Sequence, residues 1–352
     1  TEAAPHHCTG NLALSARTPN CLTSRLWPLR GFGTVRVRTV REVVMSKKVL
    51  VATEKPFSPA AVTELKKVFA AANYDVTMLE SYTDKADLLA AVVDADAMII
   101  RSDKVTAEVL DAAKQLKIVV RAGAGYDNID CAHAASKDVV AMNTPGQNSN
   151  AVAELVFGMM IMNARNNYNG KPGTEVRGKK LGIHAFGNVG IYVARAAHGF
   201  GMDVYAFDPF VDDAAIKEHG VTPLGSMEEL YETCQYVSLH IPETPQTLNS
   251  INFELLSRMP KGATLINTAR LGVIDEPGLM QMFAERDDFV YLSDISPTCK
   301  DDIIANYDDK RYFFTPKKMG AQTAEANINA GVAAASQIVK FFEEGDTTFK
   351  VN

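Results

Sequence analysis

The sequence lacks the features that mark membrane proteins, disulfide-stabilised secreted proteins and nucleic-acid-binding proteins. Its 352 residues contain no apolar tract long enough to cross a bilayer. Its five cysteines are scattered and odd in number, so they give neither a disulfide framework nor a C-x-x-C metal motif. The net charge of −6 argues against a nucleic-acid partner, although a local group of arginines can still bind a small anion. We therefore expect a soluble globular protein of a reducing compartment that acts on small molecules without a metal.

Charge is unevenly distributed along the chain. Residues 1–44 contain six arginines, no lysine and two glutamates, which gives them a net charge of +4, whereas residues 45–352 carry −10. The first segment lacks helical and strand periodicity and is rich in Arg, Ser and Thr, as organelle transit peptides are. The run MSKKVLVATE from Met45 resembles a natural start equally well. We leave residues 1–44 out of the fold, and two locations stay open: cytoplasmic, or mitochondrial or plastid if the segment is a transit peptide.

The rest of the chain shows the alternation of strand and helix patterns that builds parallel sheets. With 47% hydrophobic and 22% charged residues, a chain of this length can form two domains with separate cores. Helical patterns separate the strand-like runs, so we expect two α/β domains with doubly wound parallel sheets and ligands in a cleft between them, outside the carboxyl ends of the strands. The strand-like runs are KKVLVATE, YDVTMLES, DAMIIRS, LKIVVRAG and VVAMNTP, then KKLGIHAFG, MDVYAFDP, YVSLHIP, ATLINTAR and FVYLSDIS.

One helical pattern, over residues 150–165, is apolar on nearly every side. A helix of this kind is buried between domains or between subunits, because an exposed apolar surface needs a partner. We therefore expect a homodimer held by residues near 150–170.

The second strand series opens with a strand–turn–helix–strand pattern that is typical of dinucleotide sites. Its turn departs from G-x-G-x-x-G at the first position, which is Ala185, and keeps Gly187 and Gly190. Gly187 lets the backbone approach a pyrophosphate, and the helix start supplies amide donors. Asp208, 18 residues after Gly190, can bind both ribose hydroxyls and repel a 2′-phosphate, which favours NAD over NADP. Because a methyl group needs an ordinary φ, we expect Ala185 to remodel the first turn slightly.

Four segments together resemble the D-isomer-specific 2-hydroxyacid dehydrogenases, and the resemblance covers about residues 46–350. The segments are VVRAGAGYDNID (119–130), NTPGQNSNAVAEL (143–155), GIHAFGNVG…FDP (182–209) and LINTARLGVIDE (265–276).

The resemblance implies a domain organisation and an activity. Residues 46–146 with 322–352 would form a flavodoxin-like substrate-binding domain, and residues 147–321 a Rossmann NAD-binding domain. The protein would be an oxidoreductase. The implied reaction is the NAD-dependent oxidation of 3-phospho-D-glycerate to 3-phosphohydroxypyruvate, which is the first step of L-serine biosynthesis.

Basic residues and a glycine-rich strand end are candidates for binding such a substrate. Arg270, in NTAR, matches the family arginine that pairs with the substrate carboxylate and polarises the carbonyl group. Amides of the glycine-rich strand end can bind the same carboxylate. Arg101 and Arg121 follow apolar strands and match basic phosphate-contact positions. The predicted substrate-binding residues are Arg101, Lys104, Arg121, Gly123, Ala124, Gly125, Asn148 and Arg165, the last reaching in from a partner subunit.

Two further residues match family positions beside the cofactor. Asp294 matches a position near the nicotinamide carboxamide. His240 follows the strand YVSLH, where the family's loop passes the cofactor, but a purely structural histidine fits equally well. The predicted cofactor-binding residues are Phe186, Gly187, Asn188, Val189, Gly190, Asp208, His240, Thr268, Asp294 and Gly320.

The family's usual acid–base pair is missing. That pair is a histidine in T-P-H-x-G and a glutamate in D-V-x-x-x-E-P, whereas this chain has TPKKMG and DISPTCK, with Cys299 in place of the glutamate. Counting back from Gly320 puts Lys318 at the histidine position, and counting forward from Pro316 puts Lys317 there. Lysine has no tautomer to fix, and a nearby arginine would lower its pKa. We therefore predict Lys318 as the acid–base, with the register still open.

Two other functions stay open. The first is a reductase of glyoxylate, hydroxypyruvate or another unphosphorylated 2-keto acid. Such a substrate has no phosphate, so the enzyme would not need the three positive charges of Arg101, Arg121 and Arg165. The second is a catalytically inactive, NAD-sensing interaction protein, which the missing pair suggests and the presence of Arg270 disfavours.

Overall fold

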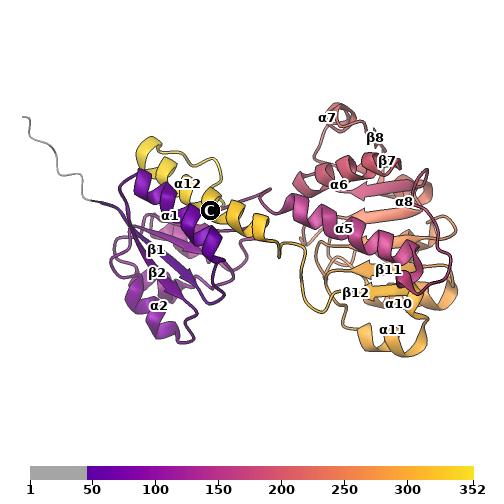
Figure 1. Ribbon diagram of the computed structural model, residues 1–352, viewed down its shortest axis with the longest axis horizontal. Coiled ribbons are helices and arrows are strands. Elements are labelled where there is room, and N and C mark those ends of the chain that lie inside the picture. The colour runs from indigo at the N-terminus through magenta and orange to yellow at the C-terminus, as the bar shows by residue number, and fades with distance from the viewer. Residues whose placement is uncertain (1–45) are drawn as a thin grey trace, which may run out of the picture. The chain divides into compact units, whose positions relative to one another are not determined.

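Two fully parallel sheets organise residues 46–352, which are the part of the chain that the computed structural model describes (Figure 1). Every pair of neighbouring strands in both sheets is parallel. The predicted fold class, two doubly wound α/β sheets, is confirmed. The predictions about residues 1–44 lie outside the described residues. Among residues 46–352, no helix is long and apolar enough to cross a membrane.

The first sheet has five strands in the order β2-β1-β3-β4-β5. Its central strands are buried along nearly their whole length because helices cover both faces, which explains their continuous apolar runs. The chain reverses its direction of winding between β1 and β3, and a ligand of such a sheet binds at this kind of point. The strands are β1 (Lys48–Thr53), β2 (Asp75–Glu80), β3 (Ala97–Ile100), β4 (Ile118–Arg121) and β5 (Val140–Asn143).

The helices of this part of the chain include one from the far end of the sequence. Helix α12 packs beside α1, as Figure 1 shows, and its small residues Ala330 and Ala334 belong to the same buried cluster as Leu65 and Phe69 of α1. Gly345, with φ of 70°, ends α12 in the left-handed conformation that glycine adopts readily. The helices are α1 (Pro59–Ala71), α2 (Lys85–Ala91), α3 (Ala107–Ala112), α4 (Cys131–Ser136) and α12 (Ala324–Glu344).

The second sheet has seven strands in the order β12-β11-β10-β9-β6-β7-β8. Its winding reverses between β6 and β9, as in dinucleotide-binding sheets. The two-residue strand β8 was not predicted, because a pair of residues carries no periodicity. The strands are β6 (Lys180–His184), β7 (Asp203–Phe207), β8 (Thr222–Pro223), β9 (Tyr236–Leu239), β10 (Thr264–Asn267), β11 (Val290–Ser293) and β12 (Tyr312–Phe314).

Helix α5, the predicted apolar helix, packs against α6, and nine of its 16 residues are buried. The ring of Phe157 stacks on that of Phe200, with centroids 5.0 Å apart. The homodimer that we expected from this helix stays a prediction. The helices around the second sheet are α5 (Ser149–Ala164), α6 (Asn188–Gly199), α7 (Asp213–Glu218), α8 (Met227–Thr233), α9 (Phe253–Ser257), α10 (Glu276–Glu285) and α11 (Lys300–Asn306), with 3₁₀ turns η1 (Asn166–Tyr168) and η2 (Asp309–Arg311).

Four hydrophobic clusters form the cores of the two sheets. Two of them draw on residues 49–142 and 328–351, and the other two on residues 153–314. The predicted domain boundaries, 46–146 with 322–352 and 147–321, stay a prediction. The cores fix the carboxyl ends of the strands, and most of the predicted site residues follow those ends.

Candidate functional site

The turn between β6 and α6 takes a backbone conformation that the sequence did not predict. Ala185 has φ of 78°, so the expectation of an ordinary φ at this residue is wrong. The reason lies in the packing of the turn: a Cβ on Gly190 would lie only 2.7 Å from the carbonyl oxygen of Ala185. The amide of Ala185 also donates to the carbonyl of Phe207, at 2.9 Å. The strand end therefore forces a left-handed residue here, at a cost of about 1–2 kcal/mol for a side chain with a Cβ.

The start of α6 presents backbone amides that have no partner in the protein. Within residues 46–352 the amides of Gly187, Asn188, Val189 and Gly190 donate to no protein acceptor. A Cβ on Gly187 would meet no atom within 4 Å, so the space in front of these amides is open. Unpartnered amides and the positive end of the helix dipole favour a phosphate at this place.

Asp208 lies directly after β7, beside this turn. Its Oδ2 accepts the amide of Phe186 at 2.8 Å, and its Oδ1 accepts the amide of Phe210 at 2.9 Å. These bonds hold the carboxylate at the edge of the sheet with lone pairs to spare, which suits a pair of ribose hydroxyls. At the end of β10, the buried hydroxyl of Thr268 has no partner among the described residues. The open amides, the fixed carboxylate and the unpaired hydroxyl together fit NAD.

Two histidines lie under the same edge of the sheet, of which His184 is buried and His240 is partly buried. His240 follows β9, and its Nε2 lies 3.0 Å from the hydroxyl of Ser238. Burial and the neighbouring His184 lower the pKa of His240 to about 3. Burial also lowers the pKa of His184, to about 4, and its Nδ1 lies 3.3 Å from the hydroxyl of Tyr231. Both imidazoles are therefore neutral at pH 7. The cofactor role of His240 stays a prediction beside this structural one.

The glycine-rich strand end after β4 holds a guanidinium group close to the backbone. A Cβ on Gly123 would lie 1.6 Å from Nη1 of Arg121, so only glycine leaves room for this arginine. The φ of Gly123 is 151°, and its amide donates to the carbonyl of Arg121 at 2.9 Å. The amides of Ala124 and Gly125 donate to no acceptor within residues 46–352. Of the three predicted amides, these two are free to bind a ligand.

Arg270 faces this strand end from the other sheet. Its Nη2 lies 3.2 Å from the position that a Cβ on Gly125 would take. Its Nη1 donates to the carbonyl of Ala269 at 2.9 Å, which fixes the direction of the guanidinium. A carboxylate placed beside Gly125 would therefore lie close to Arg270, whose guanidinium group can bind it in a bidentate manner.

Asp127 is a member of this group that the sequence did not single out. Its Oδ1 lies 3.1 Å from the same position beside Gly125 that Arg270 approaches. No sequence signal separates this aspartate from the exposed polar residues of an ordinary loop, since only the fold brings it to Arg270.

Lys318 lies among the same charges. Although its side chain is exposed, the protein atoms around it lower its pKa from the ordinary value of 10.5, and Arg270 and Arg121 lower it further. Asp294 and Asp127 oppose this effect. The charge of Lys318 therefore interacts with that of the predicted carboxylate-binding arginine, and the choice between Lys317 and Lys318 stays a prediction.

Asp294 holds the loop that carries Lys318. This buried carboxylate follows β11 and accepts the amides of Met319 and Gly320, at 2.7 and 2.8 Å. It also accepts the hydroxyl of Thr315 at 2.9 Å. Gly320 is needed here because a Cβ on it would lie 3.0 Å from Oδ2 of Asp294. The predicted contact of Asp294 and Gly320 with the cofactor stays a prediction.

Arg101 is engaged inside the protein. Its Nη1 donates to the carbonyls of Lys55 and Pro56, at 3.0 and 2.9 Å, and its Nη2 donates to Oδ1 of Asn327. The guanidinium also lies over the ring of Phe57, 5.0 Å from its centroid. Burial lowers the pKa of Arg101. The predicted phosphate role of Arg101 therefore has few free donors to draw on.

The remaining predicted substrate residues form no direct bond with this group among the described residues. Lys104 is exposed between β3 and α3, and Arg165 is exposed at the end of α5. Asn148 precedes α5, but its side chain does not cap the helix. Within residues 46–352 no hydrogen bond or ion pair joins any of these three side chains to Arg121, Arg270 or Lys318.

Cys299, at the position of the family glutamate, lies beside the carboxylate of Glu276. Its amide donates to Oε2 of Glu276 at 3.2 Å, and the amide of Thr298 donates to Oε1 of the same carboxylate at 2.7 Å. Burial, with Glu276, raises the pKa of the Cys299 thiol to about 11. The thiol therefore stays protonated at neutral pH, and the nearby carboxylate is used by the backbone.

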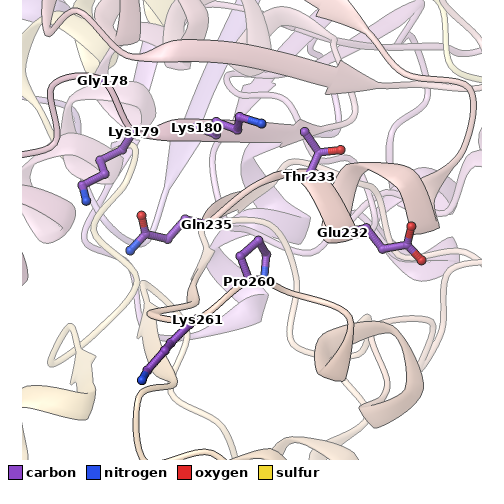
Figure 2. Close-up of a pocket in the computed structure, with 8 residues that line it drawn as sticks. All are labelled: Gly178, Lys179, Lys180, Glu232, Thr233, Gln235, Pro260 and Lys261. Atoms are coloured by element: carbon purple, nitrogen blue, oxygen red, sulfur yellow. The ribbon is translucent and has the colours of Figure 1, made fainter.

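A hollow of about 520 Å³ opens at the other edge of the second sheet (Figure 2). Lys180 begins β6, Gln235 precedes β9 and Lys261 precedes β10, so the hollow lies at the amino ends of these strands. The predicted site residues follow the carboxyl ends. The hollow is therefore separate from the predicted nucleotide and substrate sites. Its lining residues are Gly178, Lys179, Lys180, Glu232, Thr233, Gln235, Pro260 and Lys261.

Known proteins share both the sequence and the fold. Residues 134–305 match the NAD binding domain of the D-isomer specific 2-hydroxyacid dehydrogenases. A D-3-phosphoglycerate dehydrogenase of Methanocaldococcus jannaschii is 35% identical over 272 residues, which are 73% of this chain and 51% of that protein. A hydroxypyruvate reductase of Thermotoga maritima is 32% identical over 284 residues, 76% of this chain and 91% of that protein.

A solved structure extends the comparison. The crystal structure of NAD⁺-bound 3-phosphoglycerate dehydrogenase from Entamoeba histolytica has a TM-score of 0.78 and 44% sequence identity, over 87% of this chain and 99% of that one. The chain spans about half the length of several of the curated relatives that it matches. The identity and coverage of these proteins show that the chain belongs to the D-isomer specific 2-hydroxyacid dehydrogenase family.

Proposed function

We propose that the protein catalyses the NAD-dependent oxidation of 3-phospho-D-glycerate to 3-phosphohydroxypyruvate, the first step of L-serine biosynthesis. Relatives named D-3-phosphoglycerate dehydrogenase, at 33–35% identity, support this substrate, as does the NAD⁺-bound structure at 44% identity. The reaction needs a dinucleotide site, an anion site for the carboxylate and a group that takes the proton from the C2 hydroxyl.

The observation that carries the proposal is the joint placement of Gly125, Arg270 and Lys318. Nη2 of Arg270 lies 3.2 Å from the position of a Cβ on Gly125, and the amides of Ala124 and Gly125 in the same strand end donate to no acceptor within residues 46–352. The charge of Arg270 acts on Lys318. We infer that Lys318 reaches the carbon next to that carboxylate, which bears the hydroxyl group in every 2-hydroxy acid.

The chemistry divides between cofactor and protein. Bound NAD supplies the hydride acceptor. Lys318, in its neutral form, takes the hydroxyl proton, and Arg270 holds the carboxylate and stabilises the developing carbonyl group. The surrounding protein atoms, Arg270 and Arg121 favour the neutral amine that this role requires. Asp294 keeps the lysine loop in place through the amides of Met319 and Gly320.

A phosphate group on the substrate would find Arg121 near the carboxylate site. Within residues 46–352, Nε is the only donor atom of Arg121 that makes a hydrogen bond, and it donates to the carbonyl of Arg101 at 3.1 Å. Its two Nη atoms are therefore available to an anion. Arg165 of a partner subunit would add a further cation if the expected homodimer forms.

One observation favours a second substrate. The hydroxypyruvate reductase of Thermotoga maritima aligns with this chain over 91% of its length. Reduction of an unphosphorylated 2-keto acid would use the same Lys318 and Arg270 in the reverse direction, with Lys318 donating the proton.

Steady-state assays of reduced-nicotinamide absorbance separate these functions. We expect NADH formation from 3-phospho-D-glycerate and NAD. Its kcat/KM should exceed that for the oxidation of D-glycerate by NAD. It should also exceed the values for the reduction of glyoxylate and of hydroxypyruvate by NADH. Lys318→Ala should lower kcat by about 10²–10⁴-fold, the usual contribution of a general base. Lys317→Ala is the matched control and should keep most of the activity. Undiminished turnover in Lys318→Ala would refute the proposed role, and a preference for an unphosphorylated acid would refute the proposed substrate.

A further inference from the structure

Asp127 is an exposed carboxylate that the proposed reaction does not use. It lies on the loop after β4, and Oδ1 is 3.1 Å from the place that a Cβ on Gly125 would take. Nη2 of Arg270 is 3.2 Å from the same place. Within residues 46–352 the carboxylate of Asp127 accepts no hydrogen bond and forms no direct ion pair. It therefore lies beside the position that Arg270 approaches without a bond that fixes it.

The charge of Asp127 also acts on the other cations of the site. Burial lowers the pKa of Arg121, the surrounding protein atoms lower the pKa of Lys318, and Asp127 opposes the lowering in both. One carboxylate thus lies within range of three cations. No direct bond to any of them holds it, so it offsets part of their charge without being fixed.

We propose that Asp127 is a specificity-determining residue, because its carboxylate competes with the carboxylate of the ligand for Arg270 and for the space beside Gly125. This inference rests on the proposed function, which places the substrate carboxylate at that point. A ligand carboxylate there meets a like charge close by, and the repulsion cancels part of its attraction to Arg270. A 2-hydroxy acid with a single carboxylate therefore binds weakly. A second anionic group, such as a phosphate on Arg121, is needed for tight binding.

The test compares two variants that lose the same formal charge. Asp127→Asn keeps the shape of the side chain and removes the charge. Asp138→Asn is the matched control, since Asp138 lies in the turn before β5, at the amino end of the strand, with φ of 54°, which asparagine tolerates well. Calorimetric titration of D-glycerate and of 3-phospho-D-glycerate into NADH-saturated protein measures both Kd values without turnover, since ligand and cofactor are both reduced.

We expect Asp127→Asn to lower the Kd of D-glycerate by about tenfold, the effect of one partly screened charge at this range. Wild type and Asp138→Asn should bind D-glycerate equally weakly. An unchanged Kd in Asp127→Asn, or an equal gain in Asp138→Asn, would overturn the inference.

The same experiment separates this inference from the proposed function. If the wild type forms no NADH from 3-phospho-D-glycerate but Asp127→Asn still tightens D-glycerate binding selectively, the dehydrogenase proposal fails and the role of Asp127 at a carboxylate site stands. If turnover occurs and Asp127→Asn changes neither Kd, only the inference fails.

Discussion

The two glycines of the nucleotide turn have separable roles, and alanine at each position tests them. A Cβ on Gly190 would lie 2.7 Å from the carbonyl oxygen of Ala185 and 3.1 Å from Cγ2 of Ile183. The backbone contact cannot relax without moving the turn, so Gly190→Ala should destabilise the protein by about 1–3 kcal/mol, the usual cost of overpacking. A Cβ on Gly187 meets nothing within 4 Å, and its φ is −85°.

Gly187→Ala should therefore change the free energy of unfolding by less than about 1 kcal/mol. Gly187 is the N-cap of α6, and the only cost is that of a less favourable N-cap residue. Its methyl group points into the space that the pyrophosphate needs, so NAD affinity should fall at least tenfold. Thermal unfolding with and without NAD measures both effects, at roughly 1–2 °C for each kcal/mol in a chain of this size. A Gly187→Ala protein that binds NAD as tightly as the wild type would refute the assignment of these amides. A Gly190→Ala protein with an unchanged melting temperature would refute the packing argument.

Three further predictions concern titration and the lysine loop. In the oxidative direction kcat/KM should rise with pH until Lys318 is neutral, with an apparent pKa below the ordinary 10.5, and a flat profile in the wild type would contradict its role as base. His184 and His240 have pKa values of about 4 and about 3 in the folded protein, below the unfolded value of 6.5. The free energy of unfolding should therefore be unaffected by these histidines above pH 6.5. Below that pH it should fall by up to about 1.4 kcal/mol per pH unit for each histidine, because the unfolded chain binds protons that the folded one does not. Urea unfolding between pH 7 and 4 measures this slope, which His240→Gln should reduce. Asp294→Asn should lower stability by about 1–3 kcal/mol, since one loop amide loses its acceptor, and an unchanged urea midpoint would contradict that.

The parallel sheets could be predicted from the sequence because their central strands are covered on both faces. The sequences of such strands are continuous apolar runs. The residues at or just after their carboxyl ends, such as Arg121 and Asp208, gather at one edge of each sheet. The two-residue strand β8 carries no such signal.

Local chemistry was harder to predict than topology. The left-handed Ala185 depends on the close packing of Gly190 beneath it, which no local rule contains. One of the internal hydrogen bonds of Arg101 goes to Asn327, which lies 226 positions away in the sequence. Asp127 meets Arg270 only through the fold. Sequence patterns therefore located the site, whereas its charge balance needed three-dimensional contacts.

The return of α12 to the first sheet has a consequence for how the protein is made. Phe57 and Leu65 lie against Gly331 of this helix, and Phe69 shares its buried cluster. A ribosome completes the whole second sheet before it releases the helix that covers these side chains. Until then the nascent first domain exposes an apolar surface of the kind that chaperones bind. Newly made protein should therefore acquire protease resistance in the second sheet before the first.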